Sequence, residues 1–598
     1  MANLRRTRKD RLVDLFLAIL LGVVAVIAVT ALARQAGVAA PLALMVVGVL
    51  VSMLPFAPRI VVEPEIILAG VLPPLLYAAA VELPSMDFRR DFTTISALSV
   101  GLVLLTSVGV GLLMRLLIPD LSLPAAIALG AVLSPTDAVA TKITKRLGAP
   151  PRVVTVLEGE GLLNDATALV ILRSAVAASV ATVTIGQVIG DFFWAVIGAV
   201  LCGAIVGFIS VFVRRALPSP ALTTAISFVV PFAAYVPAEH LGASGLVAVV
   251  VAGLITGYFS ARYLSPQDRF FERTNWATVE LLLEGGIFLL MGLEVHALIV
   301  DVHETHDLLW QSIVFAGVAA LALLAVRALY VYPLLMQMRK VVRRRAHMRQ
   351  RLEETANKLD QRLAETPRGQ PLTIAGVDGI SPTRARRLHT RVQRTLADTD
   401  YLLSQPLGKS EGQLLVIAGM RGVITLAAAQ TLPHTFPHRS FVIMLAFFVA
   451  AGSLLLQGGT LPWVTGRLGL AGKADNTEDA HAVYHEIEDA ASAFLTNPNL
   501  KRPDGQPYPP EVIKRVQNQV VHSHNLEHDV IDSPEMLANV SMFRELWMRT
   551  LVTQRGALLH ARETGTYDSR ALDDALRAVD AEQIGLEMKP GSWLTPDD

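Results

Sequence analysis

Two carboxylates and a carboxamide lie close together in a stretch of the chain that is otherwise apolar enough for a membrane interior. They occur in the segment Glu160-Gly-Leu-Leu-Asn164-Asp165. An Asp at the centre of a membrane helix costs about 2.5–3.5 kcal/mol on insertion scales, so such a residue usually marks an ion or proton path. A buried carboxylate escapes the cost of its charge by binding either a proton or a cation. The sequence therefore predicts that Asp165 binds H+ and a metal cation, Na+, in competition, which gives exchange if the site opens to each side in turn.

Three neighbouring residues are candidates for completing this site. Asn164 either ligates the cation or supports the carboxylate, or it forms an interhelical hydrogen bond, which membrane helices use often. Asp137 follows a proline break at residues 134–136, where half-helix ends carry about half a unit charge. Neutralising positive helix ends is its favoured role, ahead of carrying the ion. Thr136 can offer its carbonyl or hydroxyl oxygen to the cation.

Three more charged residues lie within apolar stretches. Glu160 and Arg421 are expected to form an ion pair with a structural role, because stranding either charge in the interior costs several kcal/mol. Glu284 either lines a cation path or satisfies a nearby backbone group or Arg173.

Membrane helices must position these residues. The chain has 598 residues, 52% of them hydrophobic, and a mean hydropathy of +0.47. Runs of roughly 20 apolar residues are long enough to cross a bilayer core as helices. They predict an all-α polytopic membrane protein with about 13 transmembrane helices. The predicted spans are residues 12–34, 40–57, 64–82, 93–118, 123–147, 152–180, 189–213, 220–239, 243–261, 275–300, 308–337, 412–432 and 440–466.

Three of the predicted spans are interrupted. Pro73-Pro74 breaks the third, residues 134–137 break the fifth and residues 419–422 break the twelfth. Broken membrane helices are tolerated where the freed backbone lines a cavity, and breaks at matching places in two halves point to a transporter site. If spans 1–6 and 8–13 are two halves, the fifth and twelfth spans are equivalent, so their breaks predict the position of the site.

Basic residues in alternate connections predict which side is cytoplasmic. On this count residues 1–470 form a transmembrane domain with a cytoplasmic helical insertion at 338–411, and residues 471–598 form a cytoplasmic helical tail. Within the tail, helices are expected near 480–495 and 541–563. An odd number of spans places the N-terminus outside, whereas the basic residues at 5–11 favour the inside. Either the count is off by one near the start, or the later loops outweigh the first, which we favour. The basic residues counted are Lys142, Lys145, Arg146, Arg152, Arg214, Arg215, Arg262, Arg269 and Arg273.

The remaining composition excludes several kinds of protein. Lys and Arg balance Asp and Glu at 52 each, and an apolar body with a balanced tail gives no support for nucleic-acid binding. The one cysteine, Cys202, cannot form a disulfide within the chain. The tail has no metal-spaced cysteines and no glycine-rich phosphate loop, so no cofactor is expected.

Several motifs resemble those of the monovalent cation/proton antiporters, and the Asn-Asp pair is similar to their electroneutral sodium/proton exchanger branch. The resemblance covers residues 12–470 in the expected order. It implies two inverted six-helix repeats with crossed, unwound helices, in a homodimer in the plasma membrane. It also implies that Asp165 is the shared carboxylate, with Asn164 and Thr136 near it, that Glu160 pairs with Arg421, and that one cation exchanges for one proton. The motifs are Leu72-Pro-Pro-Leu-Leu-Tyr77, Leu133-Ser-Pro-Thr136-Asp137, Glu160-Gly-Leu-Leu-Asn164-Asp165, Gly419-Met-Arg421-Gly422 and Gln457-Gly-Gly-Thr-Leu-Pro462.

Two departures from the family pattern leave the preferred cation open. Gly161 stands where many members have a serine, and Ala78 stands where many have a glutamate. A K+/H+ antiporter of the same fold is therefore an alternative, with Li+ a further possible substrate. A cation channel is much less favoured. An intramembrane aspartyl protease using Asp137 and Asp165 is also disfavoured, because Asn164 replaces the glycine that such proteases need.

Overall fold

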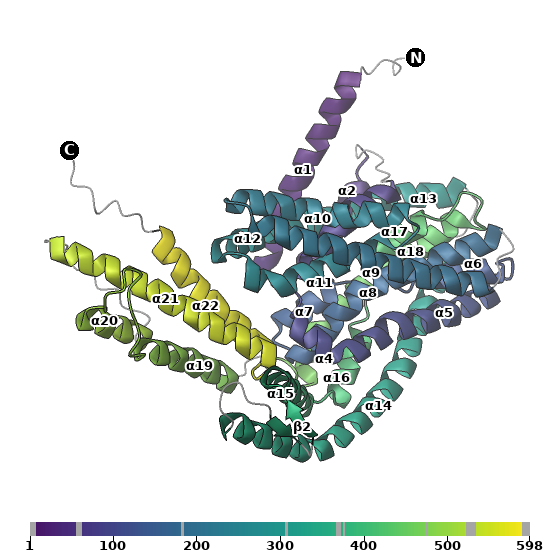
Figure 1. Ribbon diagram of the computed structural model, residues 1–598. Coiled ribbons are helices and arrows are strands. Elements are labelled where there is room, and N and C mark those ends of the chain that lie inside the picture. Colours follow the sequence, from purple (N-terminus) through teal and green to yellow (C-terminus); the bar gives the residue numbers. More distant parts are fainter. Residues whose placement is uncertain are drawn as a thin grey trace. The chain divides into compact units, whose positions relative to one another are not determined.

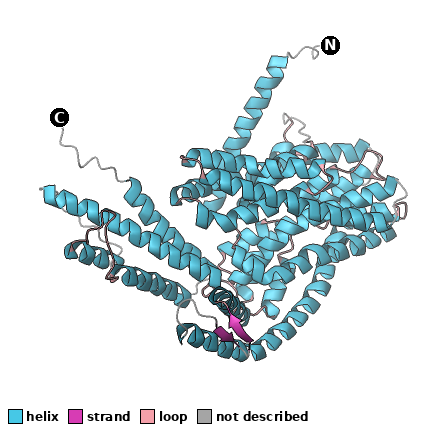
Figure 2. Ribbon diagram, viewed as in Figure 1, coloured by secondary structure: helices cyan, strands magenta, loops and turns pink. Residues whose placement is uncertain are grey.

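The computed structural model describes residues 8–55, 63–180, 185–304, 309–365, 372–374, 377–473, 477–521 and 534–588. Nearly all of this part is helical, as Figure 2 shows in cyan, so the all-α prediction is confirmed. The one sheet among the described residues is a short antiparallel hairpin of β1 (Leu372–Ile374) and β2 (Val377–Ile380). Residues 5–7, part of the basic segment used for orientation, lie outside the described residues.

Contacts divide the chain into two units, and each is described here by itself. Helices α12 and α14 contribute to both units. The first unit comprises Met1–Leu264, Phe270–Met338 and Leu407–Ala474, and the second comprises Ser265–Arg269, Arg339–Pro406 and Asp475–Asp598.

The first unit contains the apolar helices. They are α1 (Arg8–Gln35), α2 (Ala40–Ser52), η1 (Ile66–Val71), α3 (Leu72–Glu82), α4 (Ser85–Ser96), η2 (Ala97–Leu102), α5 (Val103–Leu117), α6 (Leu123–Val132), α7 (Val139–Arg146), α8 (Pro151–Val180), α9 (Ile185–Arg215), α10 (Pro220–His240), α11 (Gly245–Tyr263), α12 (Pro266–Leu293), α13 (Val295–Glu304), α14 (Leu309–Glu365), α16 (Lys409–Ile417), α17 (Val423–Gln430) and α18 (Arg439–Arg467).

Within the described residues, nine helical segments are long and apolar enough to cross a membrane. Three shorter apolar helices, Ala40–Ser52, Ile66–Glu82 and Leu123–Val132, add to these. With the broken pair α16 and α17, they match the predicted spans one for one. The structure therefore supports the polytopic membrane fold that the apolar runs predict.

The predicted interruptions take two forms. The fifth span is broken between α6 and α7, and the twelfth is broken between α16 and α17. At Pro73-Pro74 the chain does not break. Instead the π-helical segment η1 leads directly into α3, and the two prolines occupy the first turn of α3.

Glycines allow the helices of the first unit to pack closely. Helix α11 packs between α9, α10 and α3, and Figure 1 shows α10 and α11 among the long helices of this unit. A Cβ on Gly257 would come within 2.5 Å of the Val81 carbonyl oxygen, and one on Gly253 within 2.7 Å of Ala80 Cβ. Small residues at such positions let membrane helices gain van der Waals contact.

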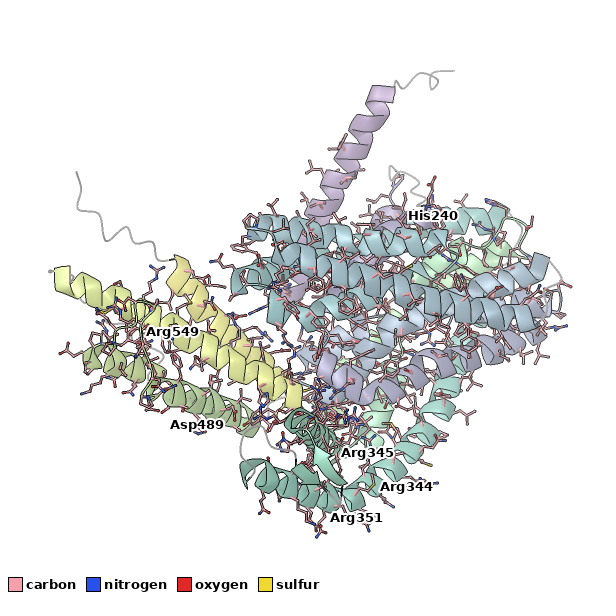
Figure 3. The ribbon with its side chains drawn as sticks, in the orientation of Figure 1. His240, Arg344, Arg345, Arg351, Asp489 and Arg549 are labelled. Atoms are coloured by element: carbon pink, nitrogen blue, oxygen red, sulfur yellow. The ribbon has the colours of Figure 1, made fainter. Side chains whose placement is uncertain are left out.

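The second unit consists of amphipathic helices with an apolar core. Helix α19 packs against α21 and α22, and α15 packs against α21. Val483, Leu546 and Ala575 are fully buried between them. The labelled Arg344 and Arg351 in Figure 3 mark the charged second half of α14. The other helices of this unit are α15 (Pro382–Ser404), α19 (Thr477–Leu495), α20 (Pro510–Val521), α21 (Pro534–Thr564) and α22 (Ser569–Met588).

Candidate ion- and proton-binding site

The two broken spans meet at their breaks. The backbone N–H of Asp137, between α6 and α7, donates to the carbonyl oxygen of Met420, between α16 and α17, at 2.8 Å. Both segments have left the helical path at this point, which frees their N–H and C=O groups. Four half-helix ends are thereby brought to one place in the bundle.

The carboxylate of Asp137 lies at the N-terminal ends of both α7 and α17. Asp137 Oδ1 accepts a hydrogen bond of 2.8 Å from the backbone N–H of Val139, the first residue of α7. Its Oδ2 lies against Gly422, the residue that precedes α17, so closely that a Cβ there would come within 1.4 Å of it. Helix N-termini carry partial positive charge, so a carboxylate in this position stabilises both. This is the position expected of a residue that neutralises helix ends.

The guanidinium of Arg421 binds carbonyl groups at the C-terminal ends of α6 and α16. Arg421 donates from Nε to the Leu133 carbonyl oxygen at 2.9 Å, at the end of α6. From Nη1 it donates to the Gly419 carbonyl oxygen, just after α16. Ser453 of α18 holds the backbone of Arg421, accepting from its N–H at 2.8 Å and donating to its carbonyl at 3.0 Å. The crossing therefore has an anionic side chain at its positive ends and a cationic one at its negative ends.

The predicted ion pair between Glu160 and Arg421 is wrong. Glu160 is bound in a bidentate manner by Arg327 of α14, with Nη1 to Oε1 at 2.5 Å and Nη2 to Oε2 at 2.8 Å. Arg327 also donates from Nε to the Leu415 carbonyl oxygen in α16 at 2.8 Å. The helix-end carbonyls hold the guanidinium of Arg421, and Glu160 pairs with Arg327 instead. Arg327 stands alone in an apolar run, and this signal could have identified it.

Asp165 and Asn164 are almost completely buried on α8, at 3% and 2% exposure. Asn164 Nδ2 donates to Thr136 Oγ1 at 2.9 Å, and a longer contact of 3.5 Å reaches the Ser134 carbonyl oxygen. No described residue forms a hydrogen bond with Asp165 Oδ1 or Asn164 Oδ1. Buried oxygens without a partner are costly, and a bound proton or cation removes that cost. The structure thus brings together Asp165, Asn164 and Thr136, as predicted.

A cavity of about 210 Å³ gives access to Asp165. This volume has room for a cation with several water molecules. Asp165, Thr136 and Asp137 line it, apolar residues of α3 and α12 form much of its wall, and the partly exposed Lys145 and Glu158 also line it. Gly161, one helical turn before Asp165, lines it too, and a Cβ at that position would have no atom within 4 Å.

Glu284 also lines this cavity, and it does not bind Arg173. Arg173 instead pairs with Glu239 at 2.8 Å. Glu284 accepts a hydrogen bond from Lys142 of α7, and Lys142 also reaches Glu280, one turn earlier on α12, at 2.5 Å. Glu284 therefore lines the same cavity as Asp165 and already has a cationic neighbour.

A helical membrane bundle in which two broken helices meet beside a buried carboxylate is the architecture of a secondary transporter. The family model described as "Sodium/hydrogen exchanger, transmembrane" matches residues 22–351, more than half of the chain. The chain belongs to this sodium/hydrogen exchanger family, so it is a cation/proton antiporter of the membrane and not an enzyme.

Similar proteins come from several bacteria. An uncharacterized Na+/H+ exchanger of Mycobacterium tuberculosis is 27% identical over 98% of both chains. The uncharacterized Na+/H+ exchanger YjcE of Escherichia coli is 36% identical over 43% of this chain and 48% of its own. A "sodium, potassium, lithium and rubidium/H+ antiporter" of Bacillus pumilus is 27% identical over 71% of this chain and 57% of its own.

A solved structure shares the fold. The sodium proton antiporter MjNhaP1 of Methanocaldococcus jannaschii superimposes with a TM-score of 0.51, covering 76% of this chain and 99% of that one at 15% identity. At this identity the likeness concerns the fold alone, and it agrees with the architecture predicted from the apolar runs and their breaks.

Proposed function

We propose that this antiporter exchanges Na+ for H+ one for one, by alternating access, with the two ions competing for Asp165. One observation carries the proposal. Asp165 has a buried carboxylate oxygen with no hydrogen-bond partner among the described residues, and it lines a cavity large enough for a cation and water.

Coupling follows from the cost of a bare charge. An ionised carboxylate without a partner is expensive in a low-dielectric interior, whereas a protonated or cation-bound carboxylate is close to neutral. Asp165 therefore changes sides readily only when it is loaded with one H+ or one Na+. The exchange of one for the other moves no net charge, so the cycle is electroneutral.

The neighbours of Asp165 have distinct roles in this proposal. Asn164 positions Thr136 through the 2.9 Å hydrogen bond and keeps its own Oδ1 available for a cation. Thr136 supplies an oxygen at the end of the fifth-span break. Asp137 and Arg421 hold the four half-helix ends together and do not carry the ion.

K+/H+ exchange at the same site is the second candidate. Gly161 adds no oxygen to the cavity, so Asp165 and water must supply more of the ligands, which weakens discrimination by size. The Bacillus pumilus relative carries a name that includes sodium, potassium, lithium and rubidium. This observation favours a broad preference among monovalent cations.

The proposal also includes an orientation and an assembly. Lys142, Lys145 and Arg146 lie at the end of α7, and a side rich in such residues is expected to be cytoplasmic. The cavity at Asp165 then faces the cytoplasm, and residues 338–411 and the tail 471–598 are assigned to the cytoplasm in this proposal. A homodimer in the plasma membrane completes the proposal and rests on the resemblance of the motifs.

The test is exchange in vesicles that contain the full chain and a pH-sensitive dye. Adding Na+ to acid-loaded vesicles should discharge the pH gradient. The half-saturating Na+ concentration should rise by up to about tenfold for each unit of acidification, the limit for competition with one proton. An imposed membrane potential should leave the rate unchanged. Cation flux driven by potential without proton movement would instead identify a channel.

A further inference from the structure

Lys142 occupies an unusual position for a residue near the end of a membrane helix. Its ammonium lies between Glu280 and Glu284 and donates to both, while the three side chains remain 42%, 27% and 19% exposed. The contacts link α7, which follows the break beside Asp165, to α12. All three residues line the cavity that also contains Asp165.

The same three side chains border a second cavity. This cavity has a volume of about 290 Å³ and is lined by Arg34 and Arg146 as well. The three side chains therefore form part of the wall of both cavities, one of which contains Asp165.

Two other glutamates around these cavities, Glu158 and Glu82, have cations of their own. Lys145 pairs with Glu158 at 3.1 Å, and Arg273 approaches Glu82 at 3.7 Å. Glu280 and Glu284, by contrast, share one lysine. The three-residue cluster thus has two carboxyl groups for one ammonium.

The chemistry of the cluster is that of a cation site. Carboxylates four residues apart on a helix face repel each other, and a cation between them relieves the repulsion. Lysine supplies a compact charge on a flexible stem with four methylene groups, so it can withdraw without disturbing the backbone. A guanidinium would hold the pair more rigidly through its fixed fork.

We propose that Lys142 is a tethered competitor of the transported cation. Its ammonium fills the place between Glu280 and Glu284 where an entering monovalent cation first binds, and it leaves that place before the cation passes to Asp165. Lys142 thereby lowers the apparent affinity for the cation and prevents the entrance from holding it too tightly. This inference rests on the proposed function, since it assumes that the cation travels to Asp165 through this cavity.

The test measures the KM for Na+, Li+ and K+ with the full chain in vesicles at a fixed pH. Lys142→Met keeps the length of the side chain and removes its charge. It should lower the KM for each cation by about three- to tenfold, because two carboxylates then attract the cation without a competitor. Lys142→Arg keeps the charge and holds the two carboxylates more rigidly, so its KM should stay unchanged or rise and should not fall.

Three more variants separate this role from a structural one. Lys145→Met removes the same charge from the next turn of α7 and should shift the KM much less. Glu284→Gln leaves Lys142 with one partner and should raise the KM. The double variant Lys142→Met/Glu284→Gln should return toward the starting value. If the ion pair only held α7 to α12, Lys142→Met and Glu284→Gln would change the KM in the same direction, and both would lower thermal stability.

An unchanged or raised KM in Lys142→Met, or an equal fall in Lys145→Met, would overturn the inference alone. If Lys142→Met does not assemble, Glu284→Gln decides, and an unchanged or lowered KM in that variant overturns the inference. Failure of the unchanged protein to exchange any of the three cations for H+ would overturn the proposed function with it.

Discussion

Glu160 and Asp165 lie on the same helix, about one and a half turns apart, in opposite surroundings. Arg327 holds both oxygens of Glu160, and its Nε also binds a backbone carbonyl of α16. Asp165 has an oxygen with no partner among the described residues, and it lines a cavity. Both side chains are almost completely buried, at 1% and 3% exposure.

The difference shows that burial alone does not make a membrane carboxylate an ion carrier. A carboxylate with a bidentate arginine has no reason to bind a proton or a cation, because its charge is already compensated. A carboxylate with a free oxygen and an access route must bind one or the other. The partner determines the role, and the comparison can be tested from either side.

The largest effect is expected at Asp165. Asp165→Asn removes the titratable charge with almost no change in volume, so exchange should be lost entirely while the protein still inserts and assembles. Dequenching of the dye in vesicles measures exchange, and thermal unfolding in detergent measures whether the protein is folded and assembled. Asp120→Asn, the same change at an exposed position, should retain exchange. Sodium-dependent proton movement in Asp165→Asn would show that the site has been assigned to the wrong residue.

At Arg327, the partner of Glu160, we expect a loss of stability in place of a loss of exchange in a folded protein. Arg327→Met leaves a buried carboxylate unpaired and should lower stability by about 3–5 kcal/mol, with poor assembly as the first symptom. Replacing both members with methionine should recover part of this loss. Thermal unfolding is the measurement.

Arg173→Met is the matched control for that change. It removes an ion pair with Glu239 in which the arginine side chain is 57% exposed. Exposed pairs contribute about 0–1 kcal/mol, so its effect on thermal unfolding should be small. If Arg327→Met matched this control and lost only transport, Glu160 would belong to the transport machinery and the comparison would fail.

The smallest effect is expected at Gly161, which lies between the two carboxylates on α8. Gly161→Ser adds a hydroxyl on the face of Asp165, because the residues are four apart on a helix. The position is open, so the side chain fits without displacing a neighbour. The KM for Na+ should fall by about two- to tenfold, the gain expected of one added ligand oxygen. Gly161→Ala adds the carbon without the oxygen and should leave the KM unchanged.

The sequence was sufficient where a local property determined the outcome. Apolar run lengths predicted the spans, and the breaks at residues 134–137 and 419–422 follow from proline and glycine within them. Asp165 and Asn164 could be identified because polar groups are rare in such runs. These inferences need only the chain itself and the cost of polar groups in lipid.

The sequence was insufficient where a partner came from a distant helix. Two buried arginines, Arg327 and Arg421, could each have paired with Glu160, and only the crossing of the helices decides between them. Lys142 was counted as a loop charge for orientation, but α7 extends past it and directs it to α12. The count of basic residues reports which side is cytoplasmic and says nothing about which acid each one contacts.

The contact between Asp137 and Gly422 has a consequence for engineering this protein. Any residue larger than glycine at 422 would meet the carboxylate that caps the facing break, and Arg421 similarly depends on the carbonyl of Leu133. The two break segments therefore pack against each other and depend on each other's residues. When ion preference is transferred between relatives, residues 133–138 and 418–422 should be exchanged together, because a segment from a relative would have to fit against the native partner segment.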